Sequence, residues 1–70
     1  MPEPDLAEMI RALTLDAAYR AALTAQLQAR VIEPALLERL IAYARSRQTT
    51  MGHALTRKVL TDAGVSWEAL

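Results

Sequence analysis

Few residues in this chain of 70 have side chains suited to chemistry, and their spacing points away from catalysis. His53 is the only histidine and the sequence has no cysteine, so a zinc site within one chain would lack two or three ligands. The nearest acid, Asp62, lies nine positions further on, and no nucleophile, base and orienting group occur at a recognisable spacing. We therefore expect a protein that is not an enzyme and binds no metal or cofactor, with His53 partly exposed at the start of a helix.

Basic residues are concentrated in one part of the sequence, although the formal net charge is zero. Between Arg39 and Thr61 there is no Asp or Glu, and a basic patch of this kind can neutralise nucleic-acid phosphates. Polar side chains in the same region could donate hydrogen bonds to those phosphates. The candidate nucleic-acid-binding residues are Arg39, Arg45, Arg47, Gln48, Thr50, His53, Arg57 and Lys58. The alternative interpretation is an ordinary solvated helical face.

Helices must position these residues, because Ala and Leu fill 25 of the 70 positions. Apolar residues recur at helical spacing and predict an all-α fold, a small bundle of three to four short helices at about 5–13, 16–30, 34–46 and 50–63. Pro34 suits the first turn of the third helix, and Gly64 followed by Val65 predicts the end of the fourth. The predicted N-caps are Asp5, then Thr14 or Asp16, then Thr49 or Thr50.

The length of the chain allows one helical domain over residues 1–70, with residues 1–4 and 65–70 as flexible or packed tails. No apolar run approaches the roughly 18 residues that a membrane span needs, and the first residues lack the basic start of a signal peptide. The absence of cysteine gives no indication of an oxidising compartment. We expect a cytoplasmic protein without a membrane partner.

The third predicted helix carries more apolar surface than one bundle face needs. A chain of this size without disulfides gains little stability from its own core, so we expect a homodimer, with a monomeric bundle as the alternative. The candidate interface residues are Leu36, Leu37, Leu40, Tyr43 and Trp67. Trp67 could instead fold back on the bundle as a staple of the core.

A run reading E-P-A-L-L-E-R-L at 33–40 is followed by Ala44, Arg45, Thr50, Leu55 and Val59. Over residues 33–60 this pattern resembles the two helices of ribbon-helix-helix DNA-binding proteins. In that family a strand before the first helix pairs with its dimer mate and lies in the major groove. The resemblance implies such a strand here, with Gln28 and Arg30 on it and Val31 as a further candidate.

A second pattern covers residues 16–44. It consists of Asp16, Tyr19, Arg20, Leu23, Leu27, Ala29, Ile32, Pro34, Ala35, Tyr43 and Ala44. These residues resemble a helical segment of small phage-encoded proteins, some of them terminase small subunits that serve in DNA packaging. The resemblance implies a phage protein.

Two functions are therefore expected from different classes. The first is a small non-enzymatic helical dimer that contacts nucleic acid, with duplex DNA as the candidate partner, through the region from Arg39 to Lys58, in an accessory or regulatory role. The alternative is an adaptor or inhibitor that docks a protein partner through its apolar helix faces, with Trp67 as an anchor.

Overall fold

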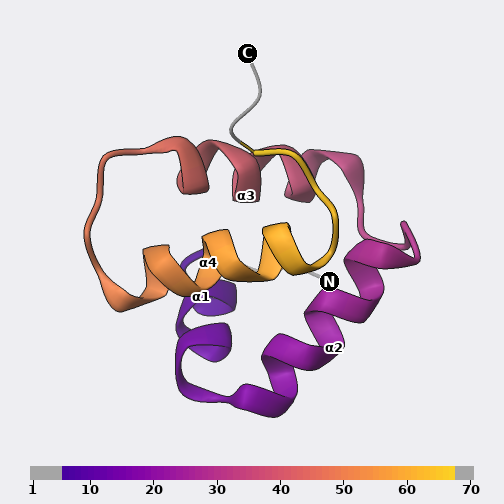
Figure 1. The fold of residues 1–70 in the computed structure, drawn as a ribbon, viewed down its shortest axis with the longest axis horizontal. Helices are drawn as coiled ribbons and strands as arrows, with labels where there is room; N and C mark the ends of the chain where they lie inside the picture. Colours follow the sequence, from indigo (N-terminus) through magenta and orange to yellow (C-terminus); the bar gives the residue numbers. More distant parts are fainter. Residues whose placement is uncertain (1–5, 68–70) are drawn as a thin grey trace.

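Residues 6–67 are described by a computed structural model, and they contain four helices and no strand. The helices are α1 (Leu6–Leu15), α2 (Ala17–Gln28), α3 (Pro34–Arg45) and α4 (Met51–Asp62) (Figure 1). The all-α fold and the number of helices are as predicted, with ends that differ by one or two residues. The predicted cap Asp5 and the tail at 1–4 lie outside the described residues, as do residues 68–70 of the second predicted tail.

Side chains cap two of the helices at their N-termini. The carboxylate of Asp16 accepts hydrogen bonds from the backbone N–H groups of Ala18 and Tyr19, at 2.9 and 3.3 Å. The hydroxyl of Thr50 accepts from the N–H of His53 at 3.2 Å. Of the predicted alternatives, Asp16 and not Thr14 caps α2, and Thr50 and not Thr49 caps α4. The α1 helix continues to Leu15, directly before the cap Asp16.

Two helices end in the same left-handed turn. Gly64 has a φ of 76°, and the N–H of Val65 donates to the carbonyl of Leu60 at 2.9 Å, as the sequence predicts. Arg30 has a φ of 61° at the matching position after α2, where the N–H of Val31 donates to the carbonyl of Gln26 at 3.1 Å. The segment 28–31 is therefore a helix end and a turn, and the strand implied there by the ribbon-helix-helix resemblance is absent.

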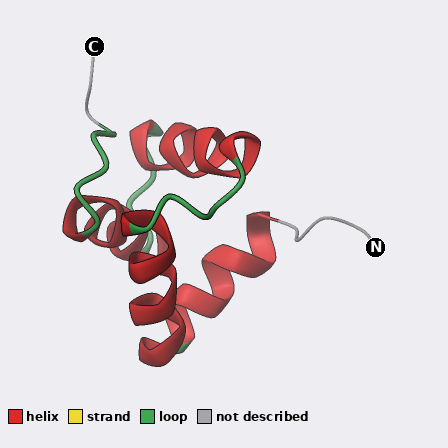
Figure 2. Ribbon diagram, turned by 90° about the vertical axis from the view of Figure 1, so that its right-hand side faces the viewer, coloured by secondary structure: helices red, strands yellow, loops and turns green. Residues whose placement is uncertain are grey.

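The core lies between the helices and draws on all four. Its buried apolar residues are Met9, Leu13, Leu23, Leu27, Leu40, Ala44, Val59 and Leu60. The α1 and α4 helices form the most extensive pair, whereas α1 touches α3 only slightly and α2 does not contact α3. Figure 1 shows α3 and α4 side by side, and Figure 2 shows the helices of the bundle after a 90° turn. The contact between α1 and α3 is thus the loosest in the bundle.

The apolar surface of α3 is covered by its own chain to a greater extent than predicted. Leu40 is 1% exposed and belongs to the core, so the prediction that it lies on a dimer interface is wrong. Leu36 and Leu37 are half-buried and pack against the same core, because α4 lies alongside this face of α3. Within residues 6–67, the large apolar side chains that remain exposed lie elsewhere, at Leu15, Val31 and Met51.

No helix in residues 6–67 combines the length and the apolar character needed to cross a bilayer.

Candidate docking groove

The α1 helix carries two neighbouring apolar stripes that meet different surroundings. Met9 and Leu13 form one stripe and are buried in the core. Leu6 and Ile10, one helical turn apart, form the next stripe and are only half-buried. The second stripe faces the side of the molecule where α1 and α3 barely meet.

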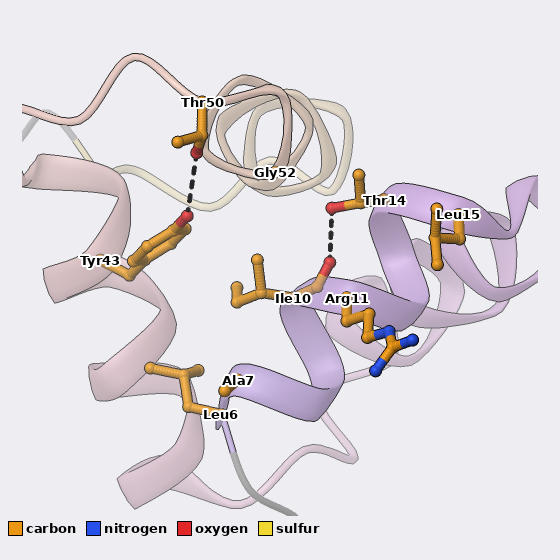
Figure 3. Close-up of a pocket in the computed structure, with 9 residues that line it drawn as sticks. All are labelled: Leu6, Ala7, Ile10, Arg11, Thr14, Leu15, Tyr43, Thr50 and Gly52. Atoms are coloured by element: carbon orange, nitrogen blue, oxygen red, sulfur yellow. Dashed lines mark hydrogen bonds between the residues drawn. The ribbon is translucent and has the colours of Figure 1, made fainter.

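An open apolar groove of about 630 Å³ lies along this second stripe (Figure 3). Its α1 wall consists of Leu6, Ala7, Ile10, Arg11, Thr14 and Leu15, and Tyr43 of α3, Thr50 and Gly52 complete it. Figure 3 shows Ile10 projecting from α1 toward Tyr43 and the first turn of α4. A volume of this size is within the range of small-ligand and side-chain binding pockets.

Gly52 forms the base of the groove because α1 and α4 approach closely there. A Cβ atom at this position would lie 2.9 Å from the Cγ2 of Ile10 and 2.9 Å from the Oγ1 of Thr14. A side chain at this position would require the Ile10 and Thr14 side chains, or α1 itself, to shift. Sequence analysis missed this role of Gly52, because a close approach between helices depends on tertiary packing.

The hydroxyl groups along the groove make hydrogen bonds within the protein. The hydroxyl of Thr14 donates to the carbonyl of Ile10 in the preceding turn, and the hydroxyls of Tyr43 and Thr50 lie 3.4 Å apart (Figure 3). The methyl groups of Thr14 and Thr50 and the aromatic ring of Tyr43 are therefore available for apolar contact. The groove offers mainly apolar surface, with few polar groups that a ligand must satisfy.

His53 lies behind the groove and is not where the sequence led us to expect it. It is 2% exposed, so the prediction of a partly exposed residue is wrong. Its ring meets the edge of the Tyr43 ring at a centroid distance of 5.3 Å, and its Nε2 has no hydrogen-bond partner within residues 6–67. The contact between α3 and α4 encloses the ring, which removes His53 from any surface that could contact nucleic acid.

One arginine of the predicted basic region, Arg57, is engaged in contacts within the protein. The Nε of Arg57 donates to the carbonyl of Ala44 at 2.7 Å, and its Nη2 donates to that of Ser46 at 3.4 Å. The Arg57 guanidinium also lies 4.5 Å from the centre of the Trp67 ring. It therefore stabilises the end of α3 and the segment after α4.

The other cations of this region do not form one patch. Lys58 pairs with Asp62 at 3.5 Å on the exposed side of α4. Arg39 and Arg45 are exposed on α3, but six residues separate them, which places them about 120° apart around the helix axis. Exposed Arg47, Gln48 and Thr50 lie between α3 and α4, at the end of α3 that carries Arg45.

Trp67 is partly buried and packs against the core. Its Nε1 donates to the hydroxyl of Thr61 at 3.0 Å, and its ring stacks against Arg57. These contacts are those of a staple that holds the chain after α4 against the bundle.

No group of three or more His, Cys, Asp or Glu residues within 6–67 is arranged to hold a metal ion. No family model, no curated protein and no solved structure matches this chain. The geometry of the groove and of the exposed cations is therefore the basis for assigning a function.

Proposed function

We propose that this protein is a small helical adaptor that docks a protein partner in the groove between α1 and α3. The observation that carries the proposal is the half-buried stripe of Leu6 and Ile10, which remains open although α1 is already anchored in the core through Met9 and Leu13. An apolar groove between helices suits the apolar face of an amphipathic helix. The fold does not need the partner in order to bury its own core.

One exposed apolar side chain extends the groove at its rim. Leu15 lines it and is 74% exposed. Burying a leucine side chain of this kind in an interface contributes about 1.5 kcal/mol or more, which corresponds to about tenfold in affinity. The rim therefore adds binding surface at no cost to the core.

A fluorescence anisotropy titration tests the proposal. The probe is a labelled, uncharged peptide of about 18 residues with leucines on one helical face and Ala and Gln on the other, because shorter isolated helices are marginal. The wild-type protein should bind it, and Leu15→Gln should weaken binding about tenfold. Val31→Gln is the matched control, because Val31 is 69% exposed but lies outside the groove. Absence of binding, or equal loss in both variants, would contradict the proposal.

Nucleic-acid binding is the second candidate, favoured by the acid-free window from Arg39 to Thr61 and by three exposed arginines in it. Arg39, Arg45 and Arg47 form no ion pair within the described part of the chain. Three cations neutralise at most about three phosphates, fewer than the roughly six to ten contacts of salt-sensitive DNA-binding proteins. The groove is for this reason the better supported site in a single chain.

A salt titration with duplex DNA separates the two candidates. Nucleic-acid binding through these arginines predicts a log–log slope near −3 that Arg45→Ala and Arg47→Ala flatten. An adaptor that uses the groove predicts no appreciable affinity for DNA at physiological salt.

A further inference from the structure

We infer that the groove selects a partner helix that carries an acidic side chain beside its apolar face. This inference rests on the proposed function, and it specifies the chemistry of the partner. It follows from the charges around the groove, which are positive on more than one wall.

Arg11 provides the first positive charge. It is the only charged residue that lines the groove within residues 6–67, it is exposed, and it forms no ion pair in that range. Ala7 and Leu15 lie one turn before and one turn after it on the same side of α1. Figure 3 shows the guanidinium projecting from α1 on the side away from Tyr43, so it would attract an acidic side chain at the edge of a docked helix.

The first turn of α4 provides a second positive region. Thr50 and Gly52 line the groove, and within residues 6–67 the backbone N–H groups of Met51 and Gly52 make no hydrogen bond. Such free N–H groups give the start of a helix a partial positive charge of about half a unit. This helix has 12 residues, so its dipole is fully developed over several turns.

Two further exposed charges, of opposite sign, belong to the helices that form the groove but do not line it. Arg39 lies one turn before Tyr43 on the same side of α3, and it too is exposed without an ion pair in the described range. Glu8 of α1 is exposed as well, and because neither Arg39 nor Glu8 lines the groove, the charge of the groove itself comes from Arg11 and the start of α4. A partner with a carboxylate next to its apolar face would thus be attracted, and one with an ammonium group would be repelled.

Three peptides that differ at one position test this inference. The uncharged peptide described above is compared with versions that carry a single Glu or a single Lys beside the leucine face. The Glu peptide should bind about fivefold more tightly than the uncharged one and the Lys peptide about fivefold more weakly, with the differences shrinking as salt is raised. Arg11→Gln should reduce the preference for the Glu peptide over the uncharged peptide from about fivefold to about twofold. Arg11→Glu should make the Lys peptide the tightest binder of the three. Arg45→Gln, on the other flank of α3, is the matched control and should leave the preference unchanged.

The possible results separate the two proposals. If the peptides bind with equal affinity and Leu15→Gln weakens all three, the inference is wrong while the docking function stands. If none binds, both are wrong. Two further results would overturn the inference. The first is self-association of the wild-type protein that Leu15→Gln abolishes. The second is binding of dodecanoate, but of no peptide, in the groove.

Discussion

The two sides of α1 differ in how completely the fold covers them. Toward the core, Met9 and Leu13 are buried, Leu13 completely. Toward α3 the same helix leaves Ile10 half-buried and Leu15 exposed beside an open groove. Two adjacent faces of one ten-residue helix thus differ: the first is buried and stabilises the fold, and the second is the docking surface that we propose.

Alanine substitutions two residues apart on α1 should have the most unequal effects. Leu13→Ala should lower the free energy of unfolding by about 2–5 kcal/mol, because it opens a cavity in a fully buried site. Leu15→Ala should change it by less than about 0.5 kcal/mol, because that side chain is exposed. Urea denaturation monitored by circular dichroism measures both. Similar losses for the two variants would show that Leu15 belongs to the core in solution.

A methyl group at Gly52 should force α1 and α4 apart. Overpacking costs about 1–3 kcal/mol and the better helix propensity of alanine returns at most about 1 kcal/mol, so Gly52→Ala should destabilise by about 1–2 kcal/mol. Denaturation curves for Gly52→Ala, Thr14→Ala and the double variant form the test. Thr14→Ala removes one of the two atoms in the way, so the double variant should be more stable than the sum of the single effects. Strict additivity would argue against the close approach.

A change far from α1 should alter stability without altering docking. Arg30 adopts a left-handed conformation that costs a residue with a side chain roughly 1–2 kcal/mol. Glycine avoids that cost but destabilises the fold by about 0.5–1 kcal/mol, because it has more freedom to lose from the unfolded chain. Arg30→Gly should therefore raise the free energy of unfolding by about 0.5–1 kcal/mol and leave peptide affinity unchanged. The control Arg47→Gly, at an exposed position with no positive φ, should be slightly destabilising. A loss of peptide affinity in Arg30→Gly would show that folding and docking are coupled.

The elements that depend on local sequence could be predicted. Apolar spacing indicated three to four helices. The caps at Asp16 and Thr50, each one of two predicted alternatives, and the helix end at Gly64 followed from side-chain and backbone preferences of those residue types. Arg30 was not expected in a left-handed turn, because that position favours glycine and the sequence offers an arginine. The turn forms because its hydrogen bonds close α2 in spite of the side chain.

The features that depend on packing between helices could not be predicted. Arg20 donates from its Nη1 to the carbonyl of Leu13 at 2.7 Å, near the end of α1, and Arg57 donates to the carbonyl of Ala44 near the end of α3. Both arginines thus cap a neighbouring helix, although their charge alone would also suit a ligand-binding site. The burial of His53 and the groove depend on how α1, α3 and α4 are placed around one another. Helical periodicity assigns a residue to a face but does not identify the helix that covers it.

The most direct test of docking on the open side of α1 is to observe where a peptide binds. Backbone amide chemical shifts of the ¹⁵N-labelled protein can be followed during titration with the Glu peptide. The account predicts the largest changes at the groove residues Leu6, Ile10, Leu15 and Gly52, with α2 and Trp67 unaffected. Changes centred on α2 or on Trp67, or no change at saturating peptide, would contradict it.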